Sequence, residues 1–239
     1  MYNTYRFSLL FLLLANFGPC FCQGIDAPLT PKKDIIIDAN RIYAPGKTFI
    51  YKVAIDSVGK GGYEEYFAMT IYPEMYNRQN IITYEYFDEY PQRNEQDSIL
   101  TKRKNEYKEK TLLVEKTNLI WIHSPRSYYA DLTQYIPFPE IKLPVKKGKT
   151  YKRSFVSIND PICNCKILVM KYKMKIEKEK RQYIHDDKPI EVYVITGEST
   201  NSKLGKYAVE YLYNEQLGFV SHKYVNSTLS LTITLKEQY

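Results

Sequence analysis

Apolar and polar residues alternate along the C-terminal part of the chain. Over residues 229–236, every second residue is Leu or Ile, and the residues between them are polar. This period of two is typical of a β-strand with one buried face. Similar stretches precede it at residues 190–198, 205–214 and 217–225, separated by short connections. Because short connections join antiparallel neighbours, we expect a β-meander here.

The same alternation marks a long strand at residues 166–180. In its second part, Met170, Tyr172, Met174 and Ile176 fall on one face, and Lys171, Lys173, Lys175, Glu177 and Glu179 on the other. One apolar and one charged face indicate a sheet with one side in water. Shorter stretches of this kind predict further strands at residues 48–55, 66–72, 80–87, 98–104, 110–116, 118–123 and 151–158.

Residues 124–149 break the pattern. This stretch contains Pro125, Pro137, Pro139 and Pro144, and proline does not fit a central strand. We interpret it as a crossing segment between two runs of strands, with a short helical turn around residues 129–135. Its aromatic and aliphatic side chains either cap a ligand cavity or plug the hydrophobic core, and the plug is the favoured interpretation.

The predicted fold class is therefore all-β and mostly antiparallel, a curved meander sheet or half-barrel. Gly-Lys-Thr opens a strand at residues 46–48 and again at 148–150. An internal duplication that produced two related halves would explain this repeated motif, but Gly-Lys is common where a turn enters a strand. We expect a single domain at residues 23–239, comprising a first half at 42–123, the crossing segment at 124–149 and a second half at 150–236.

Residues 1–22 have the features of a secretory signal peptide. Arg6 supplies the positive charge, and residues 7–17 form an apolar run too short to span a bilayer. We expect cleavage after Cys22. Lipidation at Cys20 or Cys22 is less favoured, because bulky or rigid residues precede both cysteines. The predicted location is the periplasm, the cell surface or the medium, with no transmembrane span after cleavage.

The charge of the remaining chain is moderately basic. Without the signal peptide the net charge is +6, and lysines are mixed with acidic residues along the strands. This suits a solvated surface, or attraction to anionic lipid head groups, better than nucleic acid binding. The 24 tyrosines fit half-wet sheet faces, where an amphipathic ring packs well.

Cys163 and Cys165 are the cysteine pair left after signal cleavage. They form either a small-ring disulfide or two thiols in a bend before the long strand. A metal site would need two more ligands, and the three histidines show no ligand spacing. We predict neither a metal site nor a cofactor.

A hydrolase would have to pair His123 with Ser124 or Ser127 and with Asp131. Adjacent residues of a strand point to opposite faces, so the side chains of His123 and Ser124 are poorly placed to hydrogen-bond. We interpret His123 as a structural histidine at a strand end and expect a protein that is not an enzyme.

Residues 213–224 read Tyr-x-x-x-Leu-Gly-Phe-Val-x-x-x-Tyr. With the high Tyr and Lys content and the Gln after the cleavage site, the chain resembles secreted β-proteins of Gram-negative bacteria. The stretch is similar to the closing hairpin of the LolA-like half-barrel superfamily. That resemblance implies a curved sheet around an apolar groove, in proteins that carry lipoproteins or lipid. The crossing segment departs from the family, because it is proline-rich where those carriers place helices.

Two hypotheses follow for the function. The first is a non-enzymatic secreted β-protein that binds an apolar or lipid-like ligand in its half-barrel groove. The alternative is a structural or adhesion module that contacts envelope proteins, for instance through an edge strand at residues 82–87. The side chains expected to line the ligand site are Trp121, Tyr135, Phe138, Met170, Tyr172 and Met174.

Overall fold

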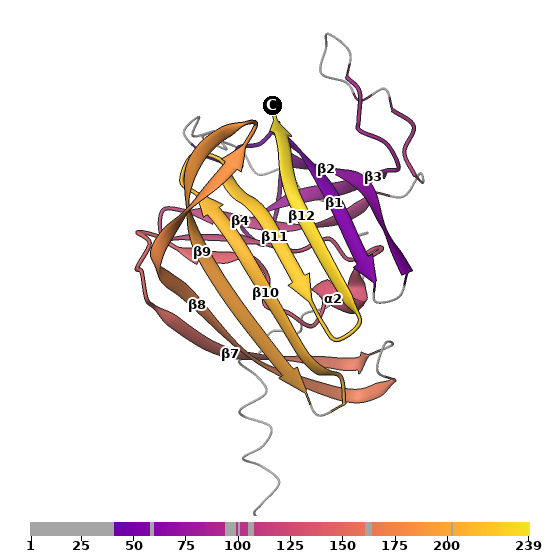
Figure 1. Cartoon of the computed structure of the whole chain (residues 1–239), viewed down its shortest axis with the longest axis vertical. Coiled ribbons are helices and arrows are strands. Elements are labelled where there is room, and N and C mark those ends of the chain that lie inside the picture. Colours follow the sequence, from indigo (N-terminus) through magenta and orange to yellow (C-terminus); the bar gives the residue numbers. More distant parts are fainter. Residues whose placement is uncertain are drawn as a thin grey trace, which may run out of the picture.

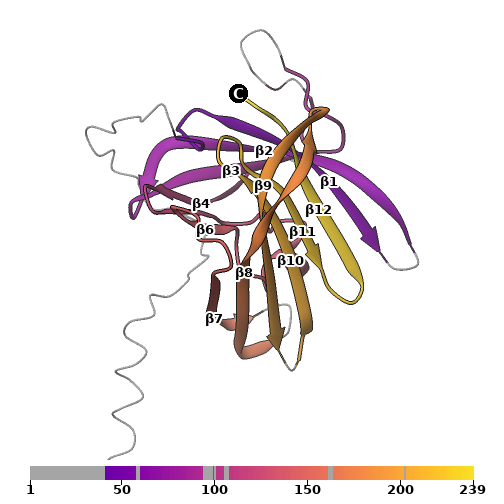
Figure 2. The same ribbon diagram turned by 60° about the vertical axis from the view of Figure 1, so that its left-hand side comes forward.

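The computed structural model describes residues 41–57, 60–93, 99, 101–104, 108–160, 164–201 and 203–239. Within these residues, twelve strands form one antiparallel sheet that curls into a half-barrel (Figures 1 and 2). The predicted fold class is confirmed. The strands are β1 (Thr48–Ser57), β2 (Lys60–Tyr76), β3 (Gln79–Phe87), β4 (Glu109–Lys116), β5 (Leu119–Ile122), β6 (Glu140–Lys142), β7 (Thr150–Asp160), β8 (Cys165–His185), β9 (Lys188–Asn201), β10 (Gly205–Asn214), β11 (Gly218–Val225) and β12 (Leu229–Gln238).

The first and the last strand pair with each other in the middle of the sheet. Val53 of β1 lies opposite Ile233 of β12, and Ile55 lies opposite Leu231. The alternating apolar residues of β12 are buried, as their period predicts. This pairing joins the strands before and after the crossing segment into one continuous sheet.

The edges of the sheet are β6 and β7. These two edge strands face each other. The Arg153 guanidinium of β7 donates to both carboxylate oxygens of Glu140 in β6, each at 2.9 Å. The Lys142 ammonium lies 5.1 Å from the centre of the Tyr151 ring. The curl therefore brings its two edges within side-chain reach. The proposed edge strand at residues 82–87 is wrong, since β3 lies between β2 and β4.

The strand expected at residues 98–104 is also wrong over its described part. Ile99 forms an isolated bridge with Arg93. Ile99 also packs on a small apolar cluster of Ile50, Ala68 and Phe87. Ile50 and Ala68 lie on the face of the sheet opposite the main core, so Ile99 covers apolar surface that an ordinary solvated face would expose.

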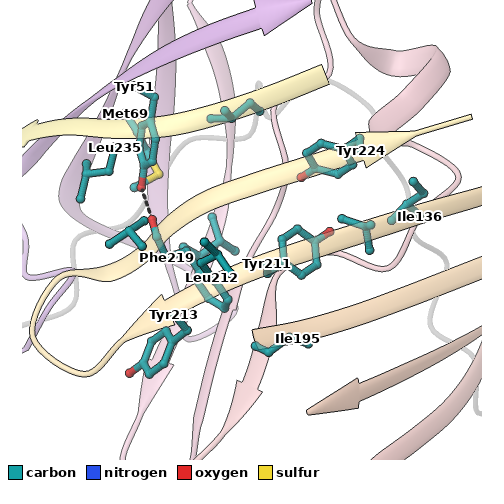
Figure 3. Close-up of a cluster of buried hydrophobic side chains, with 14 of the residues drawn as sticks. Tyr51, Met69, Ile136, Ile195, Tyr211, Leu212, Tyr213, Phe219, Tyr224 and Leu235 are labelled. Atoms are coloured by element: carbon teal, nitrogen blue, oxygen red, sulfur yellow. Dashed lines mark hydrogen bonds between the residues drawn. The ribbon is translucent and has the colours of Figure 1, made fainter. Parts of the chain in front are cut away.

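The crossing segment enters the curl of the sheet, where α2 (Ala130–Thr133) forms the expected helical turn (Figure 1). The side chains of Tyr129, Leu132, Tyr135 and Ile136 are at most 4% exposed and belong to the main core. Figure 3 shows Ile136 among core side chains of the C-terminal strands. The plug interpretation is the one that the packing supports.

None of the helices in the described residues is long and apolar enough to cross a membrane. Residues 1–22, with the predicted signal peptide and both Cys20 and Cys22, lie outside the described part of the chain.

Candidate functional site

A buried carboxylate fixes the start of the crossing segment inside the sheet. Glu109, the first residue of β4, accepts the Tyr86 hydroxyl at 2.7 Å. It also accepts the backbone N–H groups of Arg126 at 3.0 Å and Ser127 at 2.9 Å. Burial, followed by the Glu109 charge, raises the pKa of Tyr86, so the phenol stays a hydrogen-bond donor. The carboxylate thus satisfies donors that the turn into α2 would leave buried.

A second carboxylate, Glu65 of β2, binds the crossing segment at Tyr129. It accepts a hydrogen bond from the Tyr129 hydroxyl and pairs with the ammonium of Lys104. Burial and the nearby Glu65 charge raise the pKa of Tyr129. Both carboxylates therefore have partners, as a buried charge requires.

Hydroxyl groups of the sheet bind the backbone of the crossing segment along its length. Tyr84 donates to the carbonyl of His123 at 2.6 Å, and Tyr211 donates to the carbonyl of Pro137 at 2.5 Å. Between these points the Ser199 hydroxyl donates to the carbonyl of Tyr135. These bonds hold the backbone in the core just before the crossing segment, at residue 123, and near its middle, at residues 135 and 137.

His222 lies in the core inside a group of aromatic rings. Its ring centre is 5.3 Å from that of Tyr211, 5.8 Å from that of Phe219 and 6.0 Å from that of Tyr51. Burial lowers the pKa of His222 to about 3, so the imidazole is neutral near neutral pH. Its Nε2 has no hydrogen-bond partner within the described residues.

The side chains that a hydrolase would need do not form a triad among the described residues. The hydroxyls of Ser124 and Tyr224 share a hydrogen bond of 2.9 Å. His123 Nδ1 instead donates to the Ser124 carbonyl at 3.0 Å. The Asp131 side chain lies outside the described part. Among the described residues, no three His, Cys, Asp or Glu side chains are grouped to hold a metal ion.

The six candidate ligand residues separate into different environments. Tyr135, Met170 and Met174 are buried in the main core. Trp121 and Phe138 are half-buried, and their rings meet edge to face at 5.6 Å. Tyr172 is half-buried and packs against the same core, and part of it borders a hollow on the outside of the sheet. The structure does not bring the six together, and ligand binding by them stays a prediction.

The cysteine prediction also stays untested. Cys163 and the side chain of Cys165 lie outside the described part, while Asn164 between them takes a left-handed backbone conformation with φ of 49°. Such a conformation suits a tight turn.

A basic hollow on the outside of β7, β8 and β9 is a feature that the sequence interpretation missed. It is shallow, with a volume of about 490 Å³. The alternating lysines of β8 are visible in the sequence. Which residues of β7 lie beside them depends on the pairing register of the two strands, which the sequence does not show. The residues around it are Lys152, Arg153, Ser154, Lys171, Tyr172, Lys173, Glu198 and Thr200.

A smaller hollow, of about 270 Å³, lies at the opposite end of β9. There the Lys180 ammonium is 3.3 Å from a carboxylate oxygen of Glu191 and 4.7 Å from the centre of the Tyr193 ring. Since Glu215 also borders it, this hollow has two carboxylates for one ammonium and is not basic.

Neither a protein-family model nor a curated protein sequence matches this chain. Among solved structures, the chain is similar to the hypothetical lipoprotein YmcC from Escherichia coli K12. The two share 10% sequence identity and a TM-score of 0.36, over 83% of this chain and 90% of the other. A similarity of this size does not identify a family, so membership of the LolA-like half-barrel superfamily stays a prediction.

Proposed function

We propose that this chain is an exported, non-enzymatic β-protein of the bacterial envelope that acts through its outer surface. One observation carries the proposal, namely that the crossing segment fills the interior of the half-barrel. Tyr129, Leu132, Tyr135 and Ile136 occupy the space in which a carrier would hold its ligand, and each is at most 4% exposed. A core packed in this way leaves the outside of the sheet for contacts with partners.

Two further features support parts of this proposal. The charged start and apolar run within residues 1–22 support export. The Ser124 hydroxyl is buried and bonded to Tyr224 rather than to a histidine, which supports a role other than nucleophilic catalysis.

Native mass spectrometry tests the proposal. The protein is exported by a Gram-negative host, purified without refolding and transferred intact into the gas phase. A mass equal to that of the bare chain is expected. A co-purifying mass that extracts into organic solvent would contradict the proposal, because it would require space inside the half-barrel or a groove beside it.

The second candidate function is a carrier of an apolar ligand. It is favoured by the half-buried rings of Trp121 and Phe138, which lie beside each other where the crossing segment leaves the core. His123 packs on Phe138 with ring centres 4.3 Å apart. In this case Phe138→Ala removes the co-purifying mass, whereas Tyr128→Ala, an exposed control in the same segment, retains it.

A further inference from the structure

The outer face of the β7–β8 hairpin carries side chains in an ordered series of rows. Val156 lies opposite Val169, Ser154 opposite Lys171, and Lys152 opposite Lys173. Paired residues of an antiparallel ladder point to the same face, and successive rows on one face are about 7 Å apart. From the hairpin turn inward, an aliphatic row is therefore followed by two rows that contain lysine.

The aliphatic end of this hairpin is exposed to an unusual degree. Val156 is 50% exposed, Val169 43% and Ile167, one row nearer the turn, 62%. On the other face of the same strands, Leu168 and Met170 are buried in the core. A group of branched aliphatic side chains on a solvent face indicates a surface that contacts a partner.

The lysines behind this end form no ion pairs within the described residues, although Glu198 of β9 lies opposite Lys173. Lys152, Lys171 and Lys173 are exposed and form no ion pair with a described residue. Glu198 borders the hollow, but its carboxylate is 2.9 Å from the ammonium of Lys206. The hollow therefore keeps an excess of positive charge.

We propose that this face, which we call the hairpin face (Lys152, Val156, Ile167, Val169, Lys171 and Lys173), docks on the surface of an anionic lipid membrane. The order of its rows matches the layers of a bilayer. Aliphatic side chains at the turn enter the boundary between head groups and acyl chains, which amphipathic elements penetrate by about 5–10 Å. The lysines then lie about 7–14 Å further back, at the depth of lipid phosphates.

The layered order favours a membrane over other anionic partners. A nucleic acid would offer phosphates but no apolar layer in front of the lysines. Docking on a membrane goes beyond the proposed function. It rests on that function in one respect, because the outer surface of the sheet must be free to bind. In Figures 1 and 2 the β7–β8 hairpin lies at one end of the sheet, where a flat partner can approach it.

Vesicle flotation with the exported chain tests the docking. Vesicles of phosphatidylcholine alone are compared with vesicles that also contain phosphatidylglycerol. Binding is expected only to the anionic vesicles, and it should weaken as salt is added. Each lysine at an anionic surface strengthens binding about fivefold, so the double variant Lys171→Gln, Lys173→Gln should bind about 25-fold more weakly.

Matched variants control for general effects of charge and apolar area. Lys223→Gln with Lys236→Gln removes two exposed lysines of β11 and β12 and should change binding less than twofold, about the scatter between surface variants. Ile167→Ser should weaken binding about tenfold. Ile184→Ser should not, because Ile184 is equally exposed at 62% but lies at the far end of β8.

Three results would overturn the docking. The first is equal binding to both kinds of vesicle, or to neither. The second is an equal loss in the hairpin-face and control variants. The third is release of the bound protein by soluble glycerol phosphate at constant ionic strength, which would make the hollow a site for a free anion. A bare mass in native mass spectrometry together with no vesicle binding would overturn the docking and leave the proposed function standing.

Discussion

The carboxylate of Glu109 and the hydroxyl of Tyr86 lie 2.7 Å apart inside the half-barrel, where the sheet holds the crossing segment. The same carboxylate accepts two backbone N–H groups, at Arg126 and Ser127. Its position links β3, β4 and the crossing segment through one charged group, and bonds to a charged acceptor are stronger than neutral ones.

Glu109→Gln should therefore destabilise the fold by about 2 kcal/mol, because an amide presents one acceptor and one donor to a cluster of donors. The free energy of unfolding from urea titration measures the change. Glu198→Gln, an exposed control, should cost less than about 0.5 kcal/mol. Equal losses in the two variants would show that the buried contacts of Glu109 contribute little.

Two glycines with the same backbone angle offer a test of close packing. Gly218 and Gly205 both have φ of +79°. A Cβ at Gly218 would collide with the Tyr43 hydroxyl, whereas a Cβ at Gly205 would meet no atom within 4 Å. Gly205→Ala should cost about 1 kcal/mol for left-handed strain alone, and Gly218→Ala about 2 kcal/mol or more beyond that.

Thermal or urea unfolding of both glycine variants gives the comparison. Because the backbone term is the same for both, the difference between them reports the contact with Tyr43. That hydroxyl also accepts the backbone N–H of Phe219 at 2.7 Å, so displacing it breaks a buried hydrogen bond. Similar losses at the two glycines would mean that Tyr43 moves aside at little cost.

Burial of His222 predicts a dependence of stability on pH. Its folded-state pKa is lowered to about 3, while an unfolded histidine titrates near pH 6.5. Between these values the unfolded state binds the proton and the folded state does not, so stability is lost as the pH falls through this window. From about pH 7 to about pH 4 the contribution of His222 is on the order of 3 kcal/mol.

His222→Phe isolates this contribution, because it keeps an aromatic ring among Tyr211, Phe219 and Tyr51 but cannot be protonated. Wild type should lose about 3 kcal/mol more than the variant over that pH range. Unfolding titrations of both proteins at the two pH values provide the measurement. Parallel losses in both proteins would assign the acid sensitivity to carboxylates instead.

The sequence predicted those parts of the fold that depend on local pattern. The alternation of residues 229–236 gave a strand, and the helical turn of the crossing segment was anticipated. The β1–β12 pair was not visible, because it joins residues at opposite ends of the described chain and no short turn connects them. Residues 82–87 were misjudged as an edge because their second neighbour, β4, follows a long connection at residues 88–108 and not a short turn. Their neighbours on both sides decide that, not their own composition.

The candidate site was harder to predict than the fold. Met170 and Met174 were correctly placed on the apolar face of their strand, but the period alone does not tell a lined groove from a filled core. The outcome depends on where Tyr135 lies. Its carbonyl accepts the hydroxyl of Ser199, and that of Pro137 accepts the hydroxyl of Tyr211; both donors are far away in sequence.

Removing Tyr135 tests whether the interior is a core or a ligand site. Tyr135 is fully buried, so Tyr135→Ala should leave a cavity and cost about 3–5 kcal/mol. Where that variant fails to fold, Leu132→Ala gives a smaller cavity in the same segment. Tyr128→Ala is the control, since Tyr128 is 41% exposed and its contacts, with the rings of Tyr86 and Tyr129 and the Lys104 ammonium, are worth about 1 kcal/mol each.

The decisive readout is binding of an apolar fluorescent dye under native conditions. If side chains of the protein fill the half-barrel, wild type and Tyr128→Ala should not bind the dye, whereas Tyr135→Ala should bind it in the new cavity, as engineered apolar cavities do. If wild type binds the dye and Tyr135→Ala binds it less well, Tyr135 is part of a ligand site. The carrier function would then replace a role at the outer surface.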